Sequence, residues 1–198
     1  GSQSLLGYLP AMVIKKIIDD TKDLSKNLPY HYNITTVSLF ADISGFTKLS
    51  ESFAKLGRIG PEFLAFSLNR YMEKLINIIG KNGGDIFKFA GDALLVIWPE
   101  GSDLGDSCKR AIQCALDIQA ELHKVEISKD KKLSIKIGIG VGEVRILFVG
   151  GQFDRAEYLI VGEAMRVACL SETKATNGGQ TIVHESIHKL IKNFYAFE

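Results

Sequence analysis

The sequence predicts an α+β domain with a ferredoxin-like core, in which helices cover one side of a mostly antiparallel sheet. Three observations support this class. Apolar runs of strand length alternate along the chain with amphipathic stretches of helical period. Two of the runs, residues 86–90 and 93–98, are joined only by Gly91-Asp92, which is typical of a tight hairpin turn. The first elements follow the order β-α-α-β-β-α-β, which fits the ferredoxin-like core.

The elements are placed by the spacing of apolar residues and by the turn residues at their ends. The expected strands are residues 34–43, 86–90, 93–98, 133–141, 143–150, 158–161, 181–184 and a last strand that begins at Phe194. Residues 143–150 are expected to be the hairpin partner of residues 133–141. The expected helices are residues 45–56, 61–81, 106–124, 162–174 and 185–191. Ser44 is expected to cap the first of these helices, and Pro61 suits the first turn of the second. Residues 124–132 are interpreted as a charged surface loop.

Three glycines, Gly138, Gly140 and Gly142, lie inside a strand pattern. They resemble a nucleotide-binding loop only in composition, because such a loop precedes a helix. Close packing of the strand is the interpretation that their position favours.

The composition is that of a single globular domain. The chain has 198 residues, 46% hydrophobic and 24% charged, which is enough to bury a substantial core. Its net charge of +1 favours neither nucleic acid nor an anionic membrane surface as a partner. No apolar run reaches the length of a transmembrane segment, and no secretory signal is visible. Three cysteines without metal-site spacing favour free thiols in a reducing compartment, so we expect a cytoplasmic location.

Residues 1–32 are expected to precede the domain proper. Gly1-Ser2 is typical of the remnant that tag removal leaves. An apolar stripe predicts a short helix from Pro10 to Asp20, and residues 29–32 are interpreted as a connector. The folded domain is then expected to span residues 33–198.

Two aspartates stand where apolar runs end. Residues 37–41 lead directly to Asp42, which precedes the expected helix start, and Asp92 lies in the hairpin turn. If these strands pair, the two carboxylates lie side by side next to a free helix N-terminus. That arrangement suits a hard divalent cation carrying a polyphosphate. For either aspartate alone, the alternative is a structural role as a helix cap or a turn residue.

The segments Phe40-Ala-Asp-Ile-Ser-Gly-Phe-Thr47 and Phe87-Lys-Phe-Ala-Gly-Asp-Ala-Leu94 resemble the metal-binding motifs of class III nucleotidyl cyclases. The resemblance runs from about Thr36 to about Gln180, and within the family it is strongest to the first catalytic half of the bicarbonate-regulated soluble adenylyl cyclases. It implies the cyclase catalytic fold and an adenylate cyclase, a lyase that forms cyclic AMP and pyrophosphate from ATP with two Mg²⁺ or Mn²⁺ ions.

The resemblance, together with the residue types, assigns roles in such a site. Asp42 and Asp92 are expected to hold both metal ions, with the Ile43 carbonyl as a further ligand oxygen. Lys136 aligns with a basic residue that contacts the triphosphate; its alternative is a solvated lysine on an exposed strand face. The backbone amides expected to bind the β- and γ-phosphates are those of Ser44, Gly45, Phe46 and Thr47.

Three positions depart from the family pattern. A self-sufficient cyclase has an acidic or hydroxyl residue that selects the purine, and an Asn and an Arg that stabilise the transition state. In this sequence Leu159, Arg166 and Leu170 occupy those positions. Leucine can neither accept an adenine amino proton nor stabilise charge on phosphorus. We therefore expect a metal-donating half, inactive or weak until it pairs with a complementary second half, later in the same polypeptide or in a homodimer.

A second, degenerate pocket is implied at the other end of the dimer interface. In the soluble cyclases a lysine and an arginine bind the activator bicarbonate there, and two cationic side chains are well suited to bind a small anion. Lys88 matches the lysine, whereas Cys169 occupies the arginine position and Arg166 lies almost one helical turn away. Either Arg166 replaces the arginine from that turn, or bicarbonate sensing is lost.

Two further functions stay open. The first is a non-catalytic regulatory module that binds nucleotide or a small anion such as bicarbonate. The loss of the purine selector, the Asn and the Arg favours it, and the retention of Asp42 and Asp92 opposes it. The second is a guanylyl cyclase half, because the partner half would mainly set the choice of base.

Overall fold

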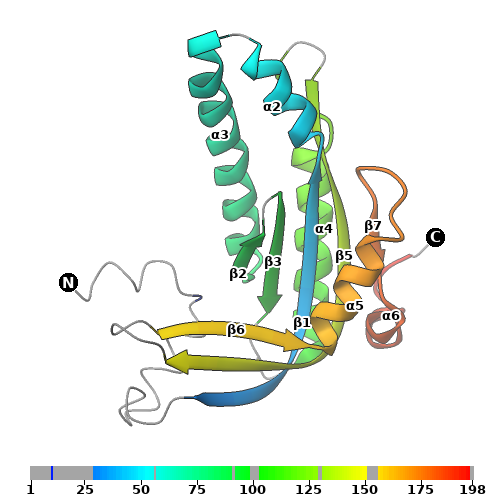
Figure 1. The fold of residues 1–198 in the computed structure, drawn as a ribbon. Coiled ribbons are helices and arrows are strands. Elements are labelled where there is room, and N and C mark those ends of the chain that lie inside the picture. The colour runs from blue at the N-terminus through cyan, green and yellow to red at the C-terminus, as the bar shows by residue number, and fades with distance from the viewer. Residues whose placement is uncertain are drawn as a thin grey trace.

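The computed structural model describes Pro10 and residues 29–55, 57–90, 92–98, 103–128, 131–150 and 156–196. The helix expected over residues 10–20 lies outside this part of the chain, apart from Pro10. Seven strands in the described part form one sheet of order β2-β3-β1-β5-β4, with β6 and β7 also paired to β5 (Figure 1). All of these pairs are antiparallel except that of β5 with β7.

Most of the elements lie where the sequence predicts them, and the exceptions are β4, the length of β5 and the expected last strand. The strands are β1 (Tyr30–Ser44), β2 (Asp85–Ala90), β3 (Ala93–Trp98), β4 (Val125–Ser128), β5 (Lys131–Gly150), β6 (Ala156–Gly162) and β7 (Thr181–Val183). The helices are α2 (Phe46–Ala54), the short 3₁₀ helix η3 (Gly57–Ile59), α3 (Gly60–Lys81), α4 (Leu104–Leu122), α5 (Glu163–Glu172) and α6 (Glu185–Ile191). The predicted mostly antiparallel α+β architecture is confirmed.

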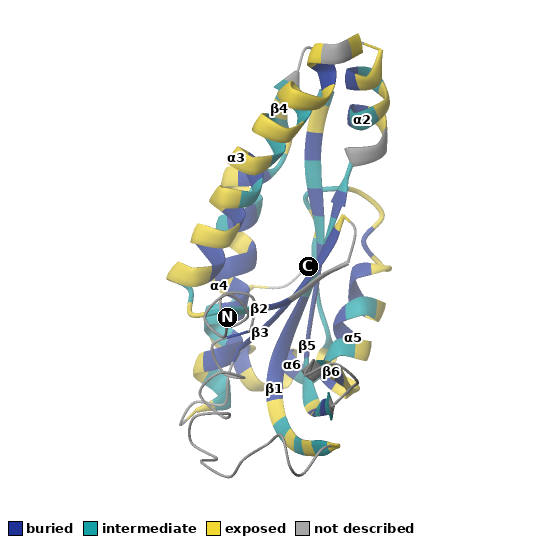
Figure 2. Ribbon diagram, turned by 60° about the vertical axis from the view of Figure 1, so that its left-hand side comes forward, coloured by how far each residue is buried: buried dark blue, intermediate teal, exposed yellow. Residues whose placement is uncertain are grey.

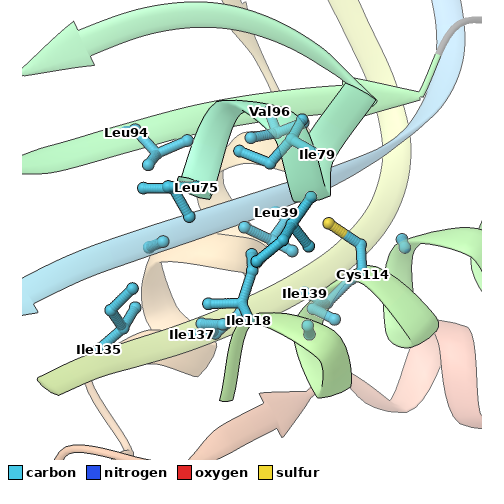
Figure 3. Packing of buried hydrophobic residues seen from close by; sticks show 14 of the residues in the cluster. Leu39, Leu75, Ile79, Leu94, Val96, Cys114, Ile118, Ile135, Ile137 and Ile139 are labelled. Carbon is cyan, nitrogen blue, oxygen red and sulfur yellow. The ribbon is translucent and has the colours of Figure 1, made fainter. Parts of the chain in front are cut away.

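Helices α3 and α4 cover one face of the sheet and enclose the main core. Figure 3 shows this core from close by, with side chains from both helices packed against three central strands. Its labelled members are Leu39, Leu75, Ile79, Leu94, Val96, Cys114, Ile118, Ile135, Ile137 and Ile139. Cys108 and Cys114 are free thiols, as the sequence predicts, and because both are buried they act as small apolar residues.

Helix α5 packs on the opposite face, across β1 and β5 (Figure 1). It lies directly on the glycines of β5: a Cβ atom on Gly138 would lie 2.0 Å from the carbonyl oxygen of Ala168. A Cβ atom on Gly140 would lie 2.2 Å from Cγ2 of Val167 and 3.0 Å from the nitrogen of Ala168. The prediction of close packing at these glycines is confirmed, but the neighbour is a helix. The expectation of helices on only one side of the sheet was too narrow.

Strand β5 is continuous over residues 131–150, where the sequence predicted two strands joined by a hairpin. The predicted hairpin was wrong because β1 pairs with β5 along the whole length of β1, from Tyr30 opposite Phe148 to Ser44 opposite Ser134. The same pairing makes residues 30–32 strand rather than connector. Tyr32 stacks on Phe148 with 6.1 Å between the ring centroids, which holds this end of β1 in the sheet. Figure 2 shows that this end is alternately exposed.

Two further predictions were wrong. The charged loop expected over residues 124–132 contains β4, which pairs with the start of β5 after a turn at Lys124 with φ of 55°. Residues 194–196 form no strand, because Tyr195 instead packs on α4 and its hydroxyl donates to the Lys109 carbonyl at 3.3 Å. No helix in the described residues is long and apolar enough to cross a membrane.

Candidate active site

Strand pairing brings Asp42 and the β2–β3 turn to one corner of the sheet. Asp42 lies opposite Ala93, the first residue of β3, and the amide of Ile43 donates to the Asp92 carbonyl at 3.0 Å. Because Asp92 immediately precedes Ala93, both aspartates predicted from the sequence belong to the same corner. Asp92 is exposed, and the Asp42 side chain keeps 29% of its surface exposed. Both carboxylates are therefore accessible to a ligand.

Helix α2 begins at the same corner, but Ser44 does not cap it. The N-cap residue is Gly45, with φ of 96° and no side-chain cap. Ser44 is still part of β1, and its hydroxyl donates to the Ser134 carbonyl at 3.0 Å. A Cβ on Gly45 would lie 2.8 Å from the Lys132 carbonyl oxygen, so both the conformation and the space require glycine. The first amides of a helix have no partner within it, and the N-cap Gly45 has no side chain that could satisfy them.

Lys136 is the cross-strand neighbour of Asp42 on β5. Its ammonium lies 3.7 Å from Asp42 Oδ2 and 2.6 Å from Glu172 Oε1. Only 25% of the Lys136 side chain is exposed, so the alternative of a freely solvated lysine is wrong. The hydrogen bond to Glu172 is the main reason that the pKa of Lys136 lies above its usual value, and Lys136 is thus a cation at neutral pH.

Glu172 is the residue that sequence reasoning missed at this corner. It ends α5 on the stripe that also contains Ala164 and Ala168, all three buried against β5. The spacing of four residues puts them on one helical face. A glutamate on such a buried stripe is unusual unless it has a partner, and that was the available signal.

The electrostatics of the corner favour a bound cation. Burial raises the pKa of the Asp42 carboxyl above its ordinary value, and the charges of Glu172 and Asp92 raise it further, while Lys136 lowers it. The carboxylates of Asp42 and Glu172 thus flank the ammonium of Lys136, and the charge of Asp92 also acts on Asp42. Carboxylate oxygens are the ligands that Mg²⁺ and Mn²⁺ prefer, so the donor types fit such an ion. The described residues contain no cluster of three or more His, Cys, Asp or Glu side chains arranged for a metal, so water or phosphate oxygens would have to complete the coordination.

The raised pKa of Asp42 predicts that Asp42→Asn makes the fold slightly more stable at pH 7. The ionised Asp42 carboxylate is less stable in the folded protein than in the unfolded chain, where water solvates it. Asp42 therefore lowers the stability of the fold as the pH rises through its raised pKa. The melting temperature of the variant should exceed that of the wild type by about one to a few degrees. The gain should disappear below the ordinary pKa of 3.8, where both states hold the proton. A variant that melts several degrees lower at pH 7 would contradict this.

The remaining predicted residues lie on β2 and α5. Lys88 is opposite Leu95 in the β2–β3 pair; its side chain, like those of Phe46 and Thr47, lies outside the described residues. Arg166 is exposed on α5 and donates to both carboxylate oxygens of Glu163, at 2.8 and 2.6 Å. The described contacts of Arg166 are thus with its own helix, and a shared anion site with Lys88 stays a prediction.

Leu159 on β6 and Leu170 on α5 each keep 47% of their surface exposed. Cys169 is half-buried, and burial raises the pKa of its thiol. The positions at which the sequence departs from the cyclase pattern therefore present two apolar side chains and one cation on the surface.

The sequence matches the profile of the adenylate and guanylate cyclase catalytic domain over residues 29–198. The chain belongs to this family. The cyclase domain is 33% identical to adenylate cyclase type 10 of Rattus norvegicus over 156 residues, which cover 77% of the chain and 10% of the rat protein. It is 29% identical to an adenylate cyclase of Anabaena cylindrica over 132 residues, which cover 66% of the chain and 25% of that protein. The domain thus spans about a tenth of the length of the rat relative.

Solved cyclase structures share the fold. The adenylyl cyclase CyaB from P. aeruginosa superposes with a TM-score of 0.70 at 26% identity, over 83% of this chain and 84% of that one. The guanylyl cyclase Cya2 superposes with a TM-score of 0.65 at 28% identity, over 80% and 79% of the two chains. The cyclase catalytic fold predicted from the two aspartate motifs is confirmed.

Proposed function

We propose that this cyclase domain is the metal-donating half of an adenylate cyclase, which forms cyclic AMP and pyrophosphate from ATP only with a complementary second half. One observation carries the proposal: the register of β1 with β3 and β5 places Asp42, the turn of Asp92 and Lys136 at one corner, beside the start of α2. ATP is the proposed substrate because the relatives in rat and Anabaena cylindrica are adenylate cyclases.

Cyclisation requires the ribose 3′-oxygen to attack the α-phosphorus in line with the departing pyrophosphate. Two divalent ions at such a site would ease deprotonation of the 3′-hydroxyl and neutralise phosphate charge. In our proposal Asp42 and Asp92 hold these ions, with the Ile43 carbonyl as an additional ligand. Lys136 contacts the triphosphate, and the amides that begin α2 hold its β- and γ-phosphates.

The second half would supply what Leu159, Arg166 and Leu170 cannot. Neither leucine can hydrogen-bond a purine or stabilise charge at phosphorus. The guanidinium of Arg166 is hydrogen-bonded to the carboxylate of Glu163. Exposure of both leucines is compatible with a partner surface over this region. The partner half would then also decide between ATP and GTP, and a cytoplasmic location is part of the proposal.

The test is cyclic nucleotide formation with Mn²⁺ and either ATP or GTP, by the chain alone and after addition of a second half. That half should carry an acidic residue, an Asn and an Arg at the positions of Leu159, Arg166 and Leu170. We expect little or no product from the chain alone, and equal amounts of cyclic AMP and pyrophosphate from the mixture. Cyclic GMP as the main product would favour a guanylyl cyclase half. No product from the mixture, beside an active control pair, would favour a regulatory module and overturn the proposal.

A further inference from the structure

Lys136 lies between two carboxylates, and its ammonium is closer to one of them than to the other. The ammonium is 2.6 Å from Glu172 Oε1, a close ion pair, and 3.7 Å from Asp42 Oδ2, which is near the outer limit of one. Asp42 is part of the proposed metal corner, whereas Glu172 is on another element, at the end of α5. The lysine is thus drawn toward the residue that has no proposed contact with metal or nucleotide.

Glu172 is held in its place by backbone packing. Its side chain is only 8% exposed, and its main-chain nitrogen would lie 2.3 Å from a Cβ atom on Gly138. Helix α5 is therefore in van der Waals contact with β5 at this point and cannot move closer. Lys136 is two residues from Gly138 on the same face of β5, since side chains alternate along a strand. A buried carboxylate needs a compensating partner, and within the described residues Lys136 is the cation that pairs with it.

We propose that Glu172 is a positioning residue that holds the ammonium of Lys136 away from Asp42, so that the Asp42 carboxylate stays available to a divalent cation. The inference rests on the proposed metal role of Asp42. Without the charge of Glu172, Asp42 becomes the nearest carboxylate for Lys136, and the lysine can close the remaining distance. An ammonium on Asp42 then competes directly with the metal ion.

The test is the affinity of the chain alone for Mn²⁺. It is measured from the electron paramagnetic resonance signal of the unbound Mn²⁺, and this measurement does not depend on catalysis. Glu172→Gln keeps the shape of the side chain and removes its charge. We expect Glu172→Gln to weaken Mn²⁺ binding about tenfold, because the Lys136 ammonium would move a few ångströms closer to the Asp42 carboxylate that binds the ion. Lys136→Met removes the competing cation and is expected to strengthen binding.

The double variant separates two ways in which Glu172 could act. If Glu172 acts through Lys136, adding Glu172→Gln to Lys136→Met changes Mn²⁺ affinity by less than about twofold. If Glu172 instead attracts the metal ion directly, the substitution weakens binding equally in both backgrounds, and the inference is overturned. Glu73→Gln, an exposed position on α3, is the matched control for a lost charge and should bind Mn²⁺ like the wild type.

The outcomes also separate this inference from the proposed function. A wild-type chain that binds Mn²⁺ no better than Asp42→Asn would overturn the metal corner itself. Wild-type binding that depends on Asp42 but is unchanged in Glu172→Gln would overturn only the role of Glu172. Each variant is checked by thermal unfolding, and Glu172→Asp serves as a second variant that keeps the charge. Glu172→Asp should restore at least part of the affinity lost in Glu172→Gln, which a purely structural role of the side-chain shape would not produce.

Discussion

Asp42→Asn and Asp92→Asn are each expected to lower cyclic AMP formation by the reconstituted pair at least about a thousandfold. Each substitution keeps the size of the side chain and removes one of the two carboxylate charges at the corner formed by β1 and the β2–β3 turn. Because both residues would hold the same ions, the double variant should be no worse than either single variant. The measurement is the initial rate with Mn²⁺-ATP at saturating second half.

A matched control for these variants is Asp106→Asn on α4. Asp106 is an exposed aspartate that pairs with Arg110 on the same helix, at 3.0 Å. A surface pair of this kind contributes little to stability, so the control should retain activity within about twofold. If Asp42→Asn or Asp92→Asn retained activity close to that of Asp106→Asn, the two aspartates would not be the metal ligands.

Gly138→Ala is expected to have the largest effect on stability. The added methyl group would overlap the Ala168 carbonyl oxygen at 2.0 Å and the Glu172 amide nitrogen at 2.3 Å, both backbone atoms that cannot rotate away. Helix α5 would have to leave the sheet. We expect the free energy of unfolding to fall by about 3 kcal/mol or more, measured by urea denaturation followed by circular dichroism.

Gly80→Ala is the matched control for that prediction. Gly80 lies inside α3, and a Cβ atom there would meet nothing within 4 Å. Alanine is the better helix former, so this variant should gain about 0.5–1 kcal/mol of stability. Equal urea midpoints for Gly138→Ala and the wild type would mean that α5 does not pack on β5 as described.

Local patterns predicted the elements whose ends depend on nearby residues. The hairpin at Asp92 and the position of Pro61 in the first turn of α3 follow from turn and helix-start chemistry within a few positions of the chain. The length of β5 could not be predicted in this way. The sequence predicted a hairpin between residues 141 and 143, and only the pairing with β1, more than ninety residues away, keeps the strand continuous.

In the candidate site, too, the residues in local motifs could be predicted, whereas those that depend on tertiary contacts could not. Asp42 and Asp92 stand in local motifs, and the resemblance to cyclases identified them. Glu172 could not be linked to Lys136 from the sequence, because their contact depends on how closely α5 approaches the glycines of β5. Ser44 was predicted to cap the helix because serine is a common cap residue. In the structure Ser44 lies in β1 opposite Ser134, and its hydroxyl donates a hydrogen bond to the Ser134 carbonyl.

The most direct test of the central claim is the position of manganese in crystals of the chain grown with Mn²⁺ and a non-hydrolysable ATP analogue. Anomalous scattering at the manganese edge locates the ions without reference to any assumed mechanism. We predict peaks within about 2.5 Å of carboxylate oxygens of both Asp42 and Asp92, with the triphosphate against the start of α2. Manganese and nucleotide bound elsewhere, with Asp42 in contact only with Lys136, would contradict the proposed site.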